Sequence, residues 1–266
     1  MIGFYGLGAM GYPMAGLLRR SGQVVAVADI LPSRVSAWNA EFGSTSPDAV
    51  DPDVVITCVT DETALDAMLG GAGGIVANTR PGRLYIDHTT TSPELARSLA
   101  ALAAEHGSMF VDAPLSGAAS GATAGDLSAF VGGSAAALAM ARPILEAYCT
   151  RITHLGAAGA GQVGKICNQI AIAGIVRGLA EANMLAAAAG LDRAALFDAL
   201  SAGSACSRQL DQHRLRLTDG EPFESLFEWL AKDLKLAMGE ARAQNVAMPL
   251  TTLVDVLLAS HSNSLK

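Results

Sequence analysis

Lys165 and Asn168 are two polar side chains that could act together on a substrate. They are three residues apart, so in a helix they would lie on the same face. The approach to them is rich in glycine, with Gly156, Gly159, Gly161 and Gly164. A cation in the first turn of a helix opposes the helix dipole, so this lysine is placed poorly for stability but well for proton transfer, as a general acid or base would be. A solvated lysine at a helix start accounts equally well for the local pattern.

A second chemical feature opens the chain, the run Gly6-Leu7-Gly8-Ala9-Met10-Gly11. It follows a short apolar stretch and precedes a helical pattern, the context in which G-x-G-x-x-G binds a dinucleotide. The first glycine permits a tight turn, the second lets the backbone approach the pyrophosphate, and the third lets the helix pack on the strand. A dinucleotide cofactor is therefore predicted. Together with a lysine able to move a proton, it indicates an oxidoreductase.

Asp29 ends the second predicted strand and decides which nucleotide is expected. A carboxylate there accepts hydrogen bonds from the ribose hydroxyls and repels a 2′-phosphate, so NAD is favoured over NADP. Arg34 lies five residues further on and could turn toward a phosphate, which keeps NADP as the weaker alternative. A surface aspartate that caps the next turn would show the same local pattern.

Polar residues also follow two later strands of the predicted sheet. Val59 and Thr60 come after one strand and Thr90 after the next. Ligands of open α/β sheets bind at the carboxyl ends of the strands, so all three are predicted cofactor contacts, with Thr90 near the nicotinamide ribose. His88 lies among these threonines and is interpreted as structural rather than as a general base.

A loop of small residues follows the fifth predicted strand, in the segment Asp112–Gly117. Its backbone N–H groups and the Ser116 hydroxyl could hold a carboxylate, which makes Ser116 and Gly117 candidate substrate contacts. Composition alone does not separate this loop from an ordinary turn. Lys232, on a later predicted helix, could reach the cofactor or could simply lie on a solvated face.

Short apolar runs alternate with helical patterns through the first 160 residues. Strands are predicted at 1–5, 24–28, 54–59, 84–87, 109–112 and 129–131, with helices at 10–20, 32–42, 62–69, 93–106 and 135–148. This alternation predicts an α/β fold with a Rossmann-type, doubly wound parallel sheet. The strand pattern then stops, and helices are predicted at 162–189, 193–201, 227–244 and 249–260. We expect a dinucleotide-binding domain at 1–160 and an all-helical substrate and dimerisation domain at 161–266.

Composition argues against several classes of protein. The formal charge of -7 over 266 residues disfavours nucleic acid or an anionic membrane as partner. The four cysteines are scattered and no histidine has metal-ligand spacing, so free thiols, no metal and a cytoplasmic location are expected. No basic and apolar leader precedes the first strand. The apolar stretch 170–189 carries Arg177, Glu181 and Asn183, which are costly in lipid. It is therefore predicted to be a buried helix. Because this helix is apolar nearly all round, we expect a second subunit to cover part of it; coverage by the remaining C-terminal helices alone is the alternative.

Taken together, these residues resemble the β-hydroxyacid dehydrogenase family over almost the whole chain. The resemblance is carried, in chain order, by the segments Gly6–Ala15, Asp112–Gly117, Gly159–Asn168 and Lys232–Leu234. It implies a Rossmann domain joined by a long helix to an all-helical domain, in a homodimer or homotetramer. Two positions depart from the family pattern: Leu17 stands where asparagine is usual, and Ala118 replaces the second glycine of the substrate loop. The C-terminal segment is also shorter than is usual in the family.

The same resemblance implies roles for single residues. Lys165 would be the catalytic acid and base, with Asn168 orienting the substrate. Ser116 and Gly117 would hold the substrate carboxylate. Thr90 and Lys232 would lie on the cofactor side, with Lys232 near the nicotinamide.

We therefore expect reversible, NAD(P)-dependent hydride transfer between a 3-hydroxyisobutyrate-like β-hydroxy acid and its semialdehyde or keto acid. One alternative is a dehydrogenase of serine- or threonine-like β-hydroxy amino acids, for which no acceptor of the ammonium group is evident. Another is a catalytically silent dinucleotide-binding protein. Lys165 and Asn168 argue against the silent protein, because a cofactor sensor has no need of them.

Overall fold

The structure is a computed structural model that describes residues 1–43, 51–219 and 230–264. The chain divides into two compact units, Met1–Lys165 and Ile166–Lys266. The first combines a sheet with helices and the second is helical. Each unit is described in turn.

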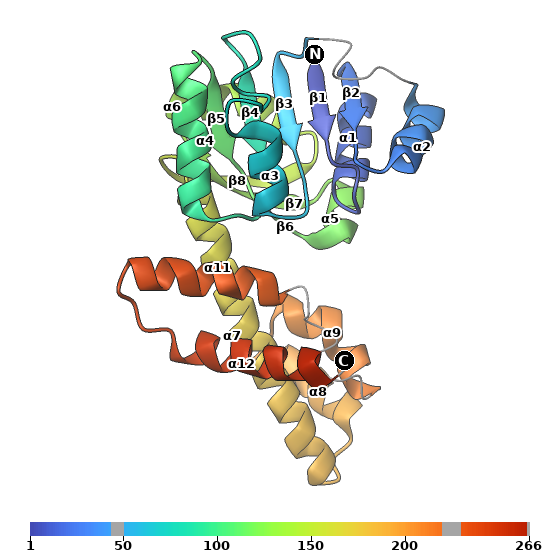
Figure 1. The fold of residues 1–266 in the computed structure, drawn as a ribbon. Coiled ribbons are helices and arrows are strands. Elements are labelled where there is room, and N and C mark those ends of the chain that lie inside the picture. Colours follow the sequence, from blue (N-terminus) through green and yellow to red (C-terminus); the bar gives the residue numbers. More distant parts are fainter. Residues whose placement is uncertain (44–50, 220–229, 265–266) are drawn as a thin grey trace. The chain divides into compact units, whose positions relative to one another are not determined.

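The first unit is built on one sheet (Figure 1). Its strands are β1 Ile2–Tyr5, β2 Val25–Ala28, β3 Val54–Thr57, β4 Leu84–Asp87, β5 Met109–Asp112, β6 Leu115–Ser116, β7 Leu127–Gly133 and β8 Cys149–Gly156. Their order is β2-β1-β3-β4-β5-β7-β6, with β8 paired to β7. Strands β1 to β5 are mutually parallel, which confirms the Rossmann-type sheet. The predicted strand at 129–131 is observed as part of β7. It runs antiparallel to β5 and β6, a direction that the strand pattern did not predict.

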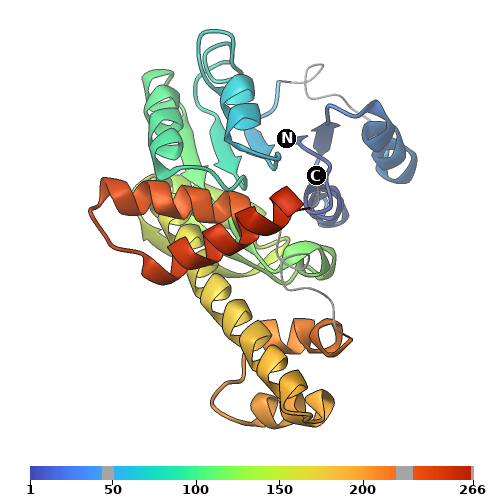
Figure 2. The same ribbon diagram turned by 60° about the horizontal axis from the view of Figure 1, so that its bottom comes forward.

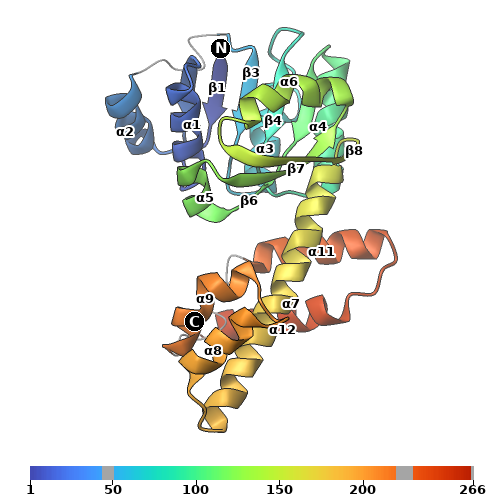
Figure 3. The same ribbon diagram turned by 180° about the vertical axis from the view of Figure 1, so that it is seen from behind.

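Among the described residues, six helices lie entirely within the first unit. They are α1 Gly11–Arg20, α2 Pro32–Phe42, α3 Glu62–Leu69, α4 Pro93–Glu105, α5 Ala118–Ala124 and α6 Ala135–Leu145. Helices α3 and α4 lie over one face of the sheet in Figure 1, and α1 and α6 lie over the other in Figure 3. Capping side chains begin three of them. Asp61, Ser92 and Ser134 each accept a hydrogen bond from a backbone N–H of the first turn of α3, α4 and α6, respectively.

Both faces of the sheet are buried. Ile56 and Ile86 pack in the core that contains α1 and α6, whereas their neighbours Val55 and Tyr85 pack in the core that contains α3 and α4. Successive strand residues point to opposite faces, so one strand supplies both cores. This explains why the central strands read as continuous apolar runs instead of alternating patterns.

Every described element of the second unit is a helix (Figure 2). It contains most of α7 Ala160–Ala188, then α8 Arg193–Ala202, α9 Arg208–Thr218, α11 Leu230–Ala243 and α12 Pro249–Ser264. Its core joins α7 to α8, α9, α11 and α12 through Val176, Phe197, Leu210, Leu234 and Val254. The predicted helix at 227–244 is observed from Leu230, and residues 227–229 lie outside the described residues.

Helix α7 is long and apolar enough to cross a membrane by length and composition alone. Polar side chains nevertheless lie along it. Arg177 Nε pairs with Glu181 Oε1 at 2.8 Å, and Asn183 Nδ2 donates to the Leu217 carbonyl at 3.0 Å. We interpret α7 as a core helix, because its apolar residues form part of the core of the second unit.

Candidate functional site

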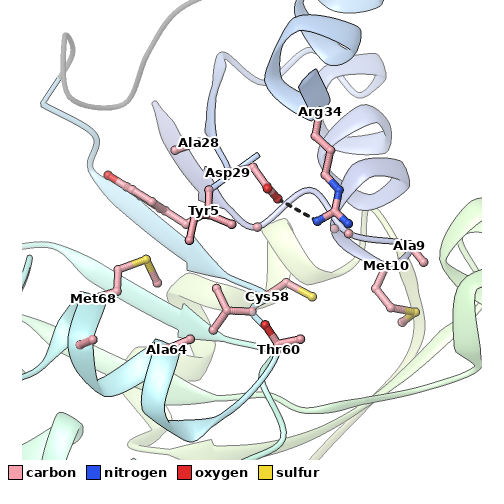
Figure 4. Close-up of a pocket in the computed structure, with 16 residues that line it drawn as sticks. Tyr5, Ala9, Met10, Ala28, Asp29, Arg34, Cys58, Thr60, Ala64 and Met68 are labelled. Atoms are coloured by element: carbon pink, nitrogen blue, oxygen red, sulfur yellow. Dashed lines mark hydrogen bonds and ion pairs between the residues drawn. The ribbon is translucent and has the colours of Figure 1, made fainter. Parts of the chain in front are cut away.

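A cavity of about 780 Å³ lies within the first unit, at the carboxyl ends of β1, β2 and β3 (Figure 4). Its lining comes from the Gly6–Gly11 turn, from Asp29 after β2 and from the loop Cys58–Thr60 after β3. Strand order reverses around β1, which has β2 on one side and β3 on the other. Such a switch point is where open α/β sheets bind their ligands.

The three glycines of the turn differ in what surrounds them. Gly6 has φ +100°, and a Cβ there would overlap the Cys58 carbonyl. A Cβ at Gly11 would overlap the Gly6 carbonyl, so α1 packs directly on the turn. At Gly8 a Cβ would meet no protein atom within 4 Å, so the protein's own packing does not require glycine there. A pyrophosphate lying against the backbone would require it.

Helix α1 begins after Met10 without a capping side chain. The N-terminus of a helix carries a partial positive charge and N–H groups that suit an anion. The open space at Gly8 borders this helix start and the cavity. These features fit the diphosphate of a dinucleotide.

Asp29 contacts both the glycine turn and the cavity. Its side chain is 4% exposed; Oδ2 accepts from the Leu7 backbone N–H at 2.6 Å and Oδ1 from that of Leu31 at 2.8 Å. The bond to Leu31 is the local capping bond that was the alternative role for Asp29. Asp29 makes this bond and also lines the cavity. A carboxylate has about four acceptor sites, so ribose hydroxyls can still bind. Arg34 Nη1 lies 3.5 Å from Oδ2 and balances part of its charge (Figure 4).

The polar residues after β3 and β4 lie on neighbouring loops. Val59 and Thr60 line the cavity, and the Val59 N–H donates to Thr89 Oγ1 at 3.2 Å. Thr90, the next residue, is half-buried. The two loops that follow adjacent parallel strands are thus tied together beside the cavity.

Lys165 is buried, with 9% of its surface exposed, on α7. It lies in the second turn rather than the predicted first turn, because the helix begins at Ala160. The reason is a distant cap: Asp112 Oδ1 accepts from the Gly159 N–H at 2.8 Å and Oδ2 from the Gln162 N–H at 3.0 Å. Asn168, one turn after Lys165 on the same helix, is half-buried.

Ser116 and Gly117 lie where β6 ends and α5 begins. Ser116 is half-buried, and Gly117 has φ +133°, a backbone that favours glycine. Ala118 follows with φ +54°. The residue that replaces the family's second glycine is therefore held in the left-handed region, which is costly for alanine.

A chain of polar contacts in the second unit joins Asn168 to Lys232. Asn168 Nδ2 donates to Gln169 Oε1 at 3.0 Å, and Gln169 Nε2 donates to Asp233 Oδ2 at 2.5 Å. Lys232 Nζ lies 3.2 Å from Asp233 Oδ1 and is 44% exposed. Gln169 and Asp233 are buried; neither was singled out from the sequence.

Two fully buried carboxylates were also missed. Asp87 and Asp112 end β4 and β5 with no exposed surface. Burial raises the pKa of Asp87 to about 7 and that of Asp112 to about 6. The sequence did contain a signal for them, because an aspartate is the last residue of each of two apolar runs, Leu84–Asp87 and Met109–Asp112.

His88 is structural, in agreement with its interpretation. Its Nδ1 lies 2.7 Å from the Ala113 carbonyl and its Nε2 lies 2.8 Å from the Tyr148 hydroxyl. A carbonyl can only accept, so Nδ1 carries the proton and Nε2 accepts from the hydroxyl. Burial lowers the pKa of His88 to about 4, so the ring is neutral near pH 7.

Two family models together match nearly the whole chain. The model of the NAD binding domain of 6-phosphogluconate dehydrogenase matches residues 1–156. The model described as NAD-binding of NADP-dependent 3-hydroxyisobutyrate dehydrogenase matches residues 159–266. The two matches fall in the order in which the sheet-containing and helical units follow one another.

Individual relatives are similar over nearly the same length. The 3-hydroxyisobutyrate dehydrogenase of Pseudomonas aeruginosa is 35% identical over 276 residues, which cover 99% of this chain and 92% of that protein. The NAD-dependent L-serine dehydrogenase of the same organism is 35% identical over 264 residues, covering 95% and 89%. The solved structure of Mycobacterium tuberculosis 3-hydroxyisobutyrate dehydrogenase with L-serine has a TM-score of 0.86 at 34% identity, covering 98% of this chain and 93% of that one.

Proposed function

This chain belongs to the β-hydroxyacid dehydrogenase family of NAD(P)-dependent oxidoreductases, and from that premise we propose that it oxidises a β-hydroxy acid reversibly, with Lys165 as the general acid and base. The observation that carries the proposal is the buried Lys165, near the start of α7, in the same unit as the cavity lined by the glycine turn and Asp29. The substrate class is a 3-hydroxyisobutyrate-like acid, and the product is its semialdehyde or keto acid.

The proposed chemistry divides between cofactor and protein. A nicotinamide bound at this site would supply the hydride acceptor for oxidation of the hydroxyl carbon and the hydride donor for reduction. The neutral amine of Lys165 takes the hydroxyl proton in oxidation, and its ammonium gives that proton back in reduction. Since Lys165 is largely shielded from solvent, few waters compete with the substrate hydroxyl for its amine.

We assign the remaining contacts to substrate and cofactor as follows. Asn168 orients the substrate, and Ser116 with Gly117 holds its carboxylate. Thr90 and Lys232 are assigned to the cofactor. The Gly6–Gly11 turn, Asp29, Val59 and Thr60 hold the nucleotide, a role supported by the cavity that these segments line.

NAD is the proposed cofactor, with NADP used less well. The support is the position of Asp29, whose carboxylate lines the cavity at the end of β2 and disfavours a 2′-phosphate. The nearby Arg34 keeps NADP binding measurable, because its guanidinium can pair with a phosphate.

Two further parts of the proposal concern the molecule's surroundings. We infer a homodimer or homotetramer, supported by the exposed apolar side chains of α7, which include Met184 and Leu185. We infer a cytoplasmic location, supported by four free cysteines.

A serine-like substrate is the second candidate, since the chain is 35% identical to an L-serine dehydrogenase. Serine is itself a β-hydroxy acid that carries an α-ammonium group, so the hydride and proton steps would be the same. The two candidates differ only in whether the site accepts that ammonium. Kinetics with serine and with 3-hydroxyisobutyrate separate them.

The test is turnover measured at the absorbance band of reduced nicotinamide. Purified protein is given NAD or NADP with 3-hydroxyisobutyrate, 3-hydroxypropionate, glycerate, 4-hydroxybutyrate, serine or threonine. Turnover of one β-hydroxy acid with NAD supports the proposal, and a preference for NADP would overturn the role of Asp29. Cofactor binding by calorimetry without turnover of any hydroxy acid would indicate the silent binding protein.

Replacing Lys165 tests the mechanism. Lys165→Ala is expected to lower kcat by roughly 10²–10⁴-fold, the usual effect of losing a general acid or base, while the Kd for NAD measured by calorimetry stays unchanged. Lys235→Ala removes an exposed lysine of α11 and is the matched control, with wild-type kcat. Near-normal turnover by Lys165→Ala would remove Lys165 from the mechanism.

A further inference from the structure

Gln162 is a fully buried amide near the start of α7. Its Oε1 accepts from the Thr91 backbone N–H at 3.1 Å, and its Nε2 donates to the Thr89 carbonyl at 2.7 Å. One carboxamide therefore binds both ends of a three-residue loop that is more than seventy residues earlier in the chain. Thr90, the proposed cofactor contact, is the middle residue of that loop.

The same loop is fixed on its other side. The Thr89 N–H donates to Asp87 Oδ1 at 3.0 Å, and Thr89 Oγ1 accepts from the Val59 N–H at 3.2 Å. Val59 lines the dinucleotide cavity. The loop is thus held between the edge of the cavity and Gln162.

The first turn of α7 is held just as firmly. Asp112 accepts from the backbone N–H groups of Gly159 and Gln162. A Cβ at Gly161 would lie only 2.5 Å from the carbonyl oxygens of Asp112 and Phe130, so the turn packs directly on β5 and β7. The backbone that carries Gln162 has little freedom to move.

Lys165 follows Gln162 by three residues, about 4.5 Å along the helix axis at 1.5 Å per residue, and on the same face. All the residues of this network belong to the first unit. Gln162 therefore links the turn that leads to the proposed acid and base with the loop that bears Thr90. In hydride transfer a displacement of about 1 Å between reacting groups can cost 10²-fold in rate.

We propose that Gln162 is a positioning residue for this reaction: by joining the Thr89–Thr91 loop to the first turn of α7, its carboxamide sets the place of Lys165 relative to the cofactor side of the site. This rests on the proposed role of Lys165. Loss of the carboxamide would leave the Thr91 N–H and the Thr89 carbonyl buried without these bonds, so the loop would shift and the geometry of transfer would loosen.

The first experiment is Gln162→Met, which keeps the length of the side chain and removes both hydrogen bonds. We expect kcat for the β-hydroxy acid to fall roughly 10- to 100-fold, with the Kd for NAD changed by less than about threefold, and a larger isotope effect with substrate deuterated at the hydroxyl carbon. In the absence of cofactor, hydrogen exchange at the Thr91 amide should become faster. Wild-type kcat in a folded Gln162→Met protein would overturn the proposal.

Asn183→Leu is the matched control. Asn183 is also a buried amide of α7, and its Nδ2 donates to the Leu217 carbonyl in the second unit. This change should lower the melting temperature without lowering kcat or hastening exchange at the Thr91 amide. An equal loss of kcat in both variants would show that general destabilisation, and not positioning, explains Gln162.

Gln162→Glu makes the two hydrogen bonds from residue 162 to the Thr89–Thr91 loop dependent on protonation. A protonated carboxyl can accept from the Thr91 N–H and donate to the Thr89 carbonyl, whereas a carboxylate repels that carbonyl. The ratio of variant to wild-type kcat should therefore rise as the pH falls. Asp87, Asp112 and Lys165 are present in both enzymes, so their own titration largely cancels in the ratio. A ratio independent of pH would contradict the proposal, even if Gln162→Met did not fold.

A double variant distinguishes the positioning role of Gln162 from the acid/base role of Lys165 on which it rests. If Gln162 acts through Lys165, then Gln162→Met should lower the residual kcat of Lys165→Ala by much less than it lowers that of the wild type. Full multiplicative loss would overturn the positioning role. An inactive Lys165→Ala beside a fully active Gln162→Met would overturn the role of Gln162 alone, whereas full turnover by Lys165→Ala would overturn both proposals.

Discussion

At the scale of single residues, Asp87 shows how a buried carboxylate in this site affects stability. It has no exposed surface, and its Oδ2 has no hydrogen-bond partner among the described residues. Burial raises its pKa from 3.8 to about 7, although Oδ1 accepts from Thr57 and Thr89. The folded state therefore binds a proton that the unfolded state has already released. The stability from Asp87 is complete below about pH 4 and is lost as the pH rises through about 7.

We expect Asp87→Asn to remove this dependence. The asparagine oxygen can still accept from Thr57 and Thr89, but the side chain cannot ionise. The free energy of unfolding of the variant, relative to wild type, should therefore rise between about pH 4 and about pH 7, by up to about 1.4 kcal/mol for each unit of pKa shift. Urea denaturation across this range measures it.

His88 titrates in the opposite sense, because its pKa is lowered to about 4. It is present in both proteins, so its contribution largely cancels in the difference between them. A difference in unfolding free energy that stays constant with pH would mean that folding does not raise the pKa of Asp87.

At the scale of elements, the start of α7 depends on close packing against the sheet. Gly161 lies where a Cβ would be 2.5 Å from the carbonyl oxygens of Asp112 and Phe130. Gly178 lies on the same helix with nothing within 4 Å of the equivalent position. The same substitution should therefore have opposite effects at the two glycines.

We expect Gly161→Ala to destabilise the protein by about 1–3 kcal/mol, the usual cost of overpacking, and to lower kcat because Lys165 is four residues further on. Gly178→Ala should stabilise by up to about 1 kcal/mol, since alanine is the better helix former, and leave kcat unchanged. Thermal melts and steady-state kinetics of both variants test this. A neutral Gly161→Ala would show that the turn can shift away from the sheet.

The elements also show what could be predicted from the sequence. Strands β1 to β5 were predicted because both faces of the sheet are buried, which makes them continuous apolar runs. Strand β8 was missed because most of its residues are exposed, and β6 because it has only two residues. Helix α9 was missed because its sequence has few apolar positions.

The candidate site likewise has a part that could be predicted from the sequence and a part that could not. The glycine turn and Asp29 form a local motif, so their proximity to one another could be read from spacing. Asp112 and Gln162 have partners 47 and 73 residues away, and no spacing rule brings such residues together. Their roles become visible only when the sheet places the ends of β4 and β5 beside the start of α7.

At the scale of the whole molecule, the helical unit leaves large apolar side chains exposed. On α7 and α12 these are Ile175, Met184, Leu185, Leu250, Leu253 and Val256, each at least 40% exposed. Apolar surface of this extent on one unit marks an interaction site in soluble proteins. A second copy of this chain is the partner that we infer, because the uncovered surface includes the long helix whose other side already forms the core of its own unit.

A charge on that surface should therefore weaken assembly. Leu185 is 72% exposed on α7, so Leu185→Glu does not disturb the core of its own chain but would bury a carboxylate in an interface, at a cost of several kcal/mol. Light scattering after size exclusion should show a dimer or tetramer for the wild type and a smaller species for the variant. The melting temperature of the wild type should also rise with protein concentration, whereas that of the variant should not.

Met140→Glu changes a similarly apolar, exposed residue on α6 of the first unit and should leave the assembly unchanged. A wild type that stays monomeric at all concentrations would show that the apolar surface of α7 serves another partner, and equal dissociation by both variants would place the interface on the first unit as well.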